Sequence, residues 1–326
     1  MPKLTPDHDS GQVSDSVTLS IVVPCFNEGL VVSQLLARLT SAAEACVGND
    51  YEIILVDDGS RDDTWNLITQ AARSSQLVRG IRLSRNFGHQ YALTAGLDSA
   101  TGDFILIIDA DLQDPPELLP SMLSLAREGH DVVYGVRRVR HGDGPFKRFS
   151  AHIFYRLLDL LVEIKVPRDA GDFRLITRRA LDEISRLREG HRYMRGMVAW
   201  IGLAQVPFYY DREARHAGVS KYPFRKMLAL ATNAITSFSI KPLRLVLLLS
   251  LAWIALAFIL LIWVLLQYFN GETVPGWASL GVFILILGGM QLFATAIIAE
   301  YVGKIFESSK GRPLYVVQER VGGRFR

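Results

Sequence analysis

The chain has 326 residues, 49% of them hydrophobic, and a formal net charge of +3. This length suits one large domain or two smaller ones, and two cysteines are too few for a disulfide framework. The small net charge argues neither for nor against nucleic acid, and no nucleic-acid partner is expected. Residues 1–18 are polar and lack an apolar signal-peptide core, which predicts a disordered tail.

From residue 19 onward, short β-branched runs alternate with longer helical patterns. Continuous apolar runs are typical of parallel strands covered on both faces. Alternating β and α units predict an α/β domain over 19–222 with a mostly parallel, doubly wound sheet. The expected strands are 19–24, 52–57, 78–83, 104–109 and 131–134, and the expected helices lie near 29–47, 61–74, 88–100 and 116–128.

Polar residues follow four of these strands. The four segments that contain these polar residues begin at Pro24, Asp57, Ser84 and Asp109. Sheets of this kind bind ligands at the carboxyl ends of their strands, so the four segments are expected to outline one crevice.

Asp109 and Asp111 flank Ala110 just past the fourth strand. Residues two apart in an extended chain point the same way, so both carboxylates can reach one hard cation. They are too few to enclose Mg²⁺ alone, and Mg²⁺ takes further ligands from phosphate and water. The pattern predicts a metal–nucleotide diphosphate site, to which Gln113 could add a carbonyl oxygen. The alternative is an exposed acidic turn.

Asp57 and Asp58 end the second strand, where an acid can accept hydrogen bonds from a ribose hydroxyl or a base. Helix capping through Asp58, Ser60 or Asp62 is the alternative interpretation. No G-x-G-x-x-G follows any strand and no P-loop motif occurs, which disfavours a dinucleotide oxidoreductase or a P-loop NTPase.

Beyond residue 135 the strand–helix alternation weakens. Residues 149–166 and 224–240 resemble amphipathic helices, with core-facing packing as the ordinary interpretation. The second leads directly into an apolar run, so a juxtamembrane helix over 223–242 in the membrane interface is favoured there.

Two runs, 245–266 and 278–299, each contain 22 residues without a charge. At about 1.5 Å rise per residue, each can cross a hydrocarbon core of about 30 Å. A two-helix membrane hairpin over 243–303 and a basic C-terminal tail over 304–326 are therefore expected. Lysines and arginines flank the runs but not the segment 267–277, so both termini and the α/β domain should be cytoplasmic.

Five ordered motifs resemble family 2 inverting glycosyltransferases. They are PCFNE at 24–28, VDDGS at 56–60, LSRNFG at 83–88, DADLQDPPE at 109–117 and GDFRL at 171–175. Within that family the chain is similar to the polyprenyl-phosphate glycosyltransferases, the group that includes dolichol-phosphate mannose synthase. It looks most like the bacterial branch that loads glucose onto undecaprenyl phosphate. The similarity runs from about residue 19 to the C-terminus.

The resemblance implies a GT-A fold that binds a nucleotide sugar, with uracil as the expected base, together with Mg²⁺ or Mn²⁺. Its implied roles fall into four groups. The nucleotide sugar would be held by Pro24, Asn27, Glu28, Asp57, Asp58 and Asp109; the metal by Asp111 and Gln113; the lipid phosphate by Arg212, Arg215, Ser220 and Lys221; and Asp172 matches the candidate base.

Chemistry limits one of these roles. A phosphate monoester has a second pKa of about 6 and is largely a dianion at pH 7, so it needs little deprotonation. Asp172 could therefore orient the acceptor or the metal, or form a structural ion pair with Arg174 or Arg178. His89 has no metal-ligand spacing and receives no role.

The expected reaction is the transfer of one sugar to a polyprenyl phosphate at the cytoplasmic face of the cell membrane. A processive polysaccharide synthase is disfavoured because the chain has no Gln-x-x-Arg-Trp motif, and a transporter because Gln291 is the only strongly polar side chain in either run. A binding scaffold without activity is disfavoured by the intact acids. The sequence leaves open which sugar is carried and whether the protein forms a homo-oligomer.

Overall fold

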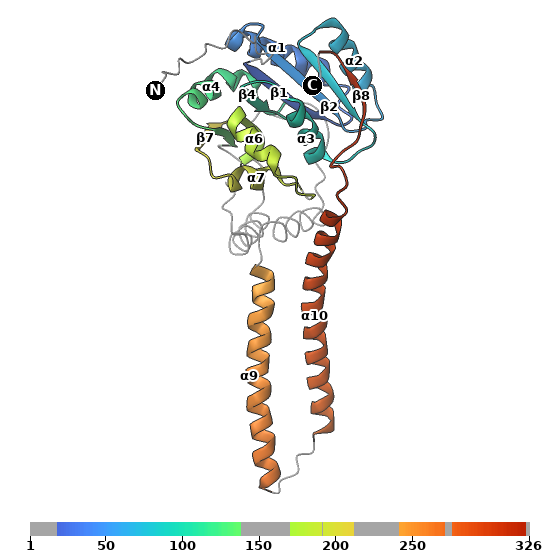
Figure 1. The fold of residues 1–326 in the computed structure, drawn as a ribbon, viewed down its shortest axis with the longest axis vertical. Helices are drawn as coiled ribbons and strands as arrows, with labels where there is room; N and C mark the ends of the chain where they lie inside the picture. The colour runs from blue at the N-terminus through green and yellow to red at the C-terminus, as the bar shows by residue number, and fades with distance from the viewer. Residues whose placement is uncertain (1–17, 138–169, 191, 212–240, 271–275, 324–326) are drawn as a thin grey trace, which may run out of the picture.

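The computed structural model describes residues 18–137, 170–190, 192–211, 241–270 and 276–323. These residues form an α/β domain from which two long helices project (Figure 1). The expected amphipathic helices 149–166 and 224–240 lie outside the described residues, as does all of the tail expected over 1–18 except Thr18.

One eight-stranded sheet organises the α/β domain, with strand order β7-β5-β6-β4-β1-β2-β3-β8. Its centre consists of parallel strands, as the sequence predicts. They are β1 (Leu19–Cys25), β2 (Tyr51–Asp57), β3 (Val78–Leu83) and β4 (Phe104–Ile107).

The sheet is mostly parallel, as predicted, and two flanking strands make it mixed. Strand β6 runs antiparallel to both β4 and β5, and β8 runs antiparallel to β3. The flanking strands are β5 (Val132–Arg137), β6 (Ala170–Thr177), β7 (Gln205–Tyr210) and β8 (Val317–Val321).

Helices cover both faces of the sheet. One face carries α1 (Val32–Val47), α2 (Thr64–Ser74), the 3₁₀ turn η1 (Pro116–Leu118) and α4 (Leu119–Arg127). The other carries α3 (His89–Ser99), α6 (Arg178–Arg186) and α7 (Met194–Trp200).

Alternate side chains of the central strands enter the two cores. Ile21 and Val23 of β1 pack on the α1 side, while Val22 packs on the α3 side. All three are buried, which explains their unbroken apolar run. Gly96 lets α3 approach β1 closely, because a Cβ there would lie 2.3 Å from Val22 Cγ1.

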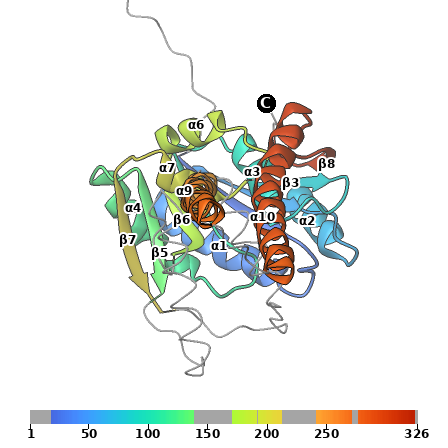
Figure 2. The ribbon, with the colours of Figure 1, turned by 90° about the horizontal axis from the view of Figure 1, so that it is seen from below.

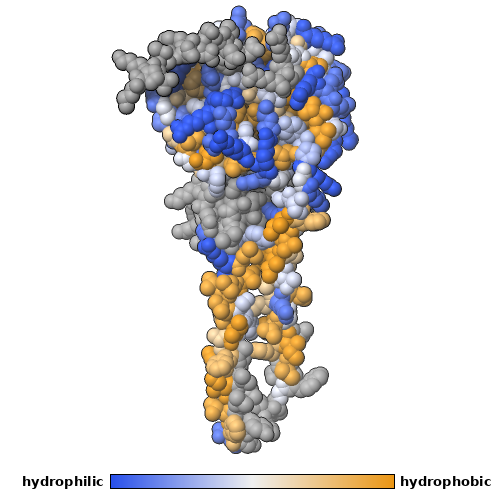
Figure 3. All heavy atoms as spheres, viewed as in Figure 1, coloured by the Kyte–Doolittle hydropathy of each residue, from blue (hydrophilic) through white to orange (hydrophobic). Residues whose placement is uncertain are grey.

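The two projecting helices are α9 (Lys241–Phe269) and α10 (Trp277–Ser309). They contact each other through the rings of Trp253 and Phe283, whose centroids are 6.2 Å apart. Apolar side chains cover much of their visible surface (Figure 3), and viewed end-on both helices lie beneath the α/β domain (Figure 2). Among the described residues, one segment, Ile286–Ser309, has the length and composition to cross a membrane.

The C-terminal segment differs from the basic tail expected over 304–326. Helix α10 continues to Ser309, and β8 joins the sheet beside β3. Trp65 donates from Nε1 to Glu319 Oε2 at 3.2 Å, which fixes β8 to α2. The chain therefore returns from the second long helix into the α/β domain.

Candidate active site

A cleft of about 320 Å³ lies at the carboxyl ends of the central strands. Four loops meet there because parallel strands end at the same edge of the sheet. The predicted site residues that line it are Pro24, Glu28, Asp58, Asp109 and Asp111. The crevice expected from the polar strand ends is thus present.

Asn27 and Asp57 lie beside this cleft and support its loops. Asn27 has a positive φ of 57°, its backbone N–H donates to Ser60 Oγ at 2.9 Å, and its Oδ1 accepts from the Arg61 N–H at 2.9 Å. Asp57 is fully buried and accepts from the Ser60 N–H at 3.1 Å. Both residues therefore join the loop after β1 to the loop after β2.

Asp58 holds the third loop. Its Oδ1 accepts from the Phe87 N–H at 2.8 Å and its Oδ2 from the Gly88 N–H at 2.9 Å. Burial raises the pKa of Asp58, although these two hydrogen bonds favour the ionised form. The carboxylate sits at the cleft wall but uses both oxygens within the protein.

The acid pair after β4 faces the cleft through both members. Asp111 accepts from the Gln113 N–H at 3.2 Å. The side chain of Gln113 is buried and is not among the residues that line the cleft. Of the two predicted metal ligands, the structure brings Asp111 to the cleft and leaves Gln113 behind it.

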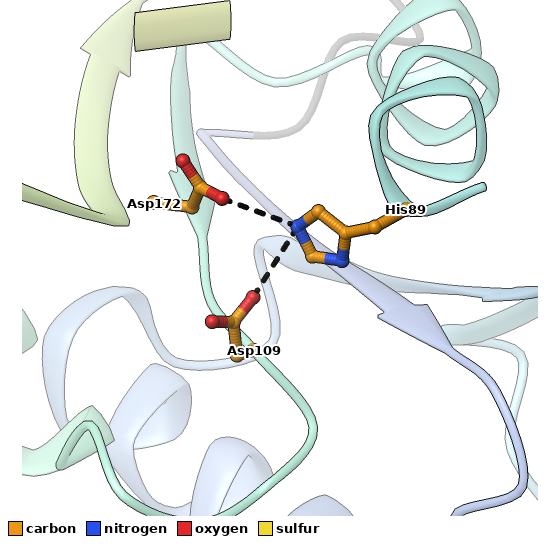
Figure 4. Close-up of side chains that lie close together, drawn as sticks. All are labelled: His89, Asp109 and Asp172. Atoms are coloured by element: carbon orange, nitrogen blue, oxygen red, sulfur yellow. Dashed lines mark ion pairs between the residues drawn. The ribbon is translucent and has the colours of Figure 1, made fainter. Parts of the chain in front are cut away.

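Strand β6 brings Asp172 next to Asp109. The antiparallel register places Ile107 opposite Arg174. Asp109 follows Ile107 by two residues and Asp172 precedes Arg174 by two, so both aspartates lie at the same end of this strand pair. His89, the first residue of α3, lies between them (Figure 4). Its Nε2 is 3.3 Å from Asp172 Oδ2 and 3.6 Å from Asp109 Oδ1.

His89 therefore corrects the sequence analysis, which gave it no role. The sequence does not reveal that His89, Asp109 and Asp172 lie together, because they come from α3, the loop after β4, and β6. A usable signal was present, since His89 directly follows the polar segment after the third strand. Burial opposes protonation of His89, but the hydrogen bond to Asp172 and the charge of Asp109 outweigh it and raise its pKa.

Asp172 is surrounded by donors. Arg195 Nε lies 2.8 Å from Oδ1, and Arg174 Nη2 is 3.8 Å from the same oxygen. Gln90 Nε2 reaches Oδ2 at 3.5 Å. Burial alone would raise the pKa of Asp172, but the His89 hydrogen bond and the two guanidinium charges hold it well below its ordinary value.

The proposed ion-pair partners of Asp172 behave differently from each other. Arg174 makes the long contact just described, whereas Arg178 donates to the backbone carbonyls of Ala100 and Gly102. The shortest ion pair is with Arg195, which no motif in the sequence singles out. Arg195 comes from α7, after a weakly patterned stretch of sequence.

The donor set fits a divalent cation. Asp109 Oδ1 is buried and, among the described residues, has no hydrogen-bond partner; its contact with His89 is longer than a hydrogen bond. Burial raises the pKa of Asp109 to about 6. A bound cation would compensate for the desolvation of the Asp109 carboxylate. Asp111 presents a second carboxylate to the same cleft. His89, Asp109 and Asp172 also each offer a ligand atom within 4.8 Å of the others.

The residues predicted to meet the lipid phosphate lie outside the described part of the chain. They are Arg212, Arg215, Ser220 and Lys221.

A mixed α/β sheet with an acidic cleft at the carboxyl ends of its parallel strands suits the binding of a metal-bound nucleotide diphosphate. Residues 20–185 match the glycosyl transferase family 2 description. The chain belongs to this family.

Relatives match along almost the whole chain. An uncharacterized glycosyltransferase, YkcC of Bacillus subtilis, is 43% identical over 95% of this chain and 96% of its own. The bactoprenol glucosyl transferase of Shigella phage SfX is 37% identical over 93% of this chain and 99% of its own. Glucosyl-3-phosphoglycerate synthase from Mycobacterium tuberculosis, solved with Mn²⁺ and uridine diphosphate, is 21% identical over 68% of this chain and 78% of its own, with a TM-score of 0.43.

Proposed function

We propose that this protein transfers glucose from UDP-glucose to a polyprenyl phosphate, with undecaprenyl phosphate as the bacterial acceptor. The observation that carries the proposal is the 37% identity, over 93% of the chain, to a protein named bactoprenol glucosyl transferase. The acidic cleft supports it, because the site has the donors that a metal-bound nucleotide diphosphate requires.

The nucleotide sugar would occupy the cleft. Pro24, Glu28 and Asp58 form the wall near β1 and β2, where base and ribose would lie, with Asn27 and Asp57 holding the loops behind them. Asp109 and Asp111 would hold Mg²⁺ or Mn²⁺, and Gln113 would have to turn its amide outward to join them. A bound cation supplies charge neutralisation to the departing diphosphate.

The acceptor would approach from the membrane. Both apolar runs form long helices, α9 and α10, and we propose that both span the membrane, with the α/β domain and both termini on the cytoplasmic side. Arg212, Arg215, Ser220 and Lys221 precede α9 in the chain and would meet the lipid phosphate near the bilayer surface. Arginine and lysine suit a phosphate ligand.

Purified protein in detergent or vesicles tests the proposal directly. Undecaprenyl phosphate is supplied with radiolabelled UDP-glucose and Mg²⁺, and the expected product is an acid-labile glucosyl lipid extracted into organic solvent. UDP-N-acetylglucosamine, UDP-N-acetylgalactosamine, GDP-mannose and an aminoarabinose donor serve as competing donors. Preferred use of another donor would overturn the sugar assignment, and transfer to none would overturn the reaction.

A further inference from the structure

Both oxygens of the Asp172 carboxylate already contact donors within the protein. One oxygen receives Arg195 Nε at 2.8 Å, and the other receives His89 Nε2 at 3.3 Å and Gln90 Nε2 at 3.5 Å. The side chain is 9% exposed. Both oxygens are thus engaged within the protein, which suits Asp172 to holding these donors in place.

Of the two arginines beside Asp172, Arg195 is the more accessible. Arg174 is buried and donates from Nε and Nη2 to the carbonyls of Asp172 and Gly171. The side chain of Arg195 is 37% exposed. Among the described residues, its contact with Asp172 uses Nε, which leaves the terminal nitrogens of the guanidinium for a further acceptor.

The position of Arg195 suits a lipid-linked ligand. It lies in the first turn of α7, at the end of the α/β domain nearest α9 and α10 (Figure 1). Arg195 contacts Asp172, which contacts His89, and His89 in turn lies beside Asp109 at the cleft. A phosphate at Arg195 would therefore stand between the membrane side and the cleft.

We propose that Arg195 binds the phosphate of the polyprenyl phosphate acceptor and that Asp172 positions Arg195. This inference rests on the proposed function. The acceptor is largely a dianion at pH 7, so it needs a cation rather than a base. One phosphate oxygen forms the bond to the anomeric carbon, the bond from that carbon to the diphosphate breaks, and its electron pair leaves with the nucleotide. No proton has to move.

Arg195→Gln tests the binding role, with Arg188→Gln as the matched control. Arg188 also pairs with an aspartate at 2.8 Å, Asp98, but at an exposed site outside the cleft. Loss of a charge-assisted hydrogen bond predicts that Arg195→Gln raises the KM for undecaprenyl phosphate about 10- to 100-fold. The Kd for the nucleotide sugar should stay within about twofold, and the control should match wild type.

An unchanged acceptor KM in Arg195→Gln would overturn the inference, as would an equal loss of donor affinity, which would mark Arg195 as structural support for the cleft. Arg195→Lys guards against a folding defect. It keeps the charge without the planar fork, so its acceptor KM should fall between those of wild type and Arg195→Gln.

Asp172→Asn separates positioning from base catalysis. Its amide oxygen can still accept from Arg195 Nε, so transfer should fall less than about 100-fold, mainly through the acceptor KM. A loss of more than about 1000-fold in kcat with unchanged acceptor KM would make Asp172 a base and overturn the inference. If wild type glucosylates no polyprenyl phosphate, the proposed function fails first, whatever the variants do.

Discussion

Asp58 shows how one side chain can shape this site without being free to bind. Its two carboxylate oxygens hold the Phe87 and Gly88 amides, and His89 follows directly as the start of α3. The location of the imidazole between Asp109 and Asp172 therefore depends on a residue in the loop after β2. Residues far apart in the sequence are joined here by hydrogen bonds from backbone amides to a side-chain carboxylate.

Asp58→Asn should weaken both the loop and the cleft. An asparagine has one oxygen for two amide donors, so one partly buried N–H would lose its partner at a cost of about 1 kcal/mol. We expect a lower Tm and a larger Kd for the nucleotide sugar, measured by thermal unfolding and by calorimetric titration. Asp63→Asn, at an exposed carboxylate, is the control. Equal behaviour of the two variants would contradict the role of Asp58.

Asp111→Asn should abolish transfer while the protein keeps its Tm, because this half-buried carboxylate faces the cleft. The wild type should lose activity in EDTA and regain it with Mg²⁺ or Mn²⁺. Asp103→Asn changes an exposed aspartate just before β4 and should remain active. Product formation by Asp111→Asn at the wild-type rate would refute the metal assignment.

At the scale of elements, β8 closes one edge of the sheet with a strand from the far end of the chain. Gly322 follows it with a φ of +73°, and a Cβ there would lie 2.4 Å from the Val78 carbonyl oxygen. Tyr315 donates to Asp98 Oδ2 at 2.9 Å, which secures the approach to β8 against α3. We call the contacts of β8 with β3, together with the Tyr315–Asp98 hydrogen bond, the C-terminal seam. This seam holds the end of α10 next to the α/β domain.

Gly322→Ala should loosen the seam. Gly311 is a matched control because it has a φ of +58°, but a Cβ added there would meet nothing within 4 Å. Both alanines incur the left-handed cost of about 1–2 kcal/mol, and only Gly322→Ala adds a clash, worth about 1–3 kcal/mol more. We expect the larger fall in Tm, and faster amide exchange in β3, for Gly322→Ala. Equal effects would show that β8 contributes little.

The central strands could be predicted from sequence because both faces are buried, which leaves an unbroken apolar run. Of the flanking strands, β5 matches the strand expected at 131–134, whereas β6, β7 and β8 were not expected. Strand β6 carries Asp172 and Arg174 into the site, so its pattern is interrupted by charge, and β8 is an exposed edge with Glu319 and Arg320. The acids of the site were predictable from their place after strands. Their partners were not, since His89 and Arg195 meet Asp172 only through the antiparallel insertion of β6.

At the scale of the whole molecule, the apolar surface of α9 and α10 contrasts with the more hydrophilic, mixed surface of the α/β domain (Figure 3). Leu256 and Phe258 in α9 and Leu292 and Phe293 in α10 are large apolar side chains that are exposed. Exposing this apolar surface to water would cost free energy, whereas contact with lipid chains would avoid that cost. The contrast supports membrane insertion of the helical pair.

Cysteine labelling tests the proposed orientation. In a background with Cys25→Ala and Cys46→Ala, Asn270→Cys lies just past α9 and Ser309→Cys at the end of α10. A membrane-impermeant maleimide should label Asn270→Cys in intact cells and Ser309→Cys only after lysis, because lysine and arginine flank the cytoplasmic ends. Labelling with the opposite pattern would invert the topology and place the cleft outside.

The short connection between α10 and β8 limits the range of motion of the enzyme. Residues 310–316 separate Ser309 from Val317, and a fully extended chain of seven residues spans at most about 25 Å. If α10 is anchored in the bilayer, the sheet cannot diffuse away to collect a substrate from solution or from a distant membrane. Turnover would then depend on lateral diffusion of lipids to the protein, and its rate should follow the two-dimensional concentration of acceptor in the bilayer rather than its amount per volume.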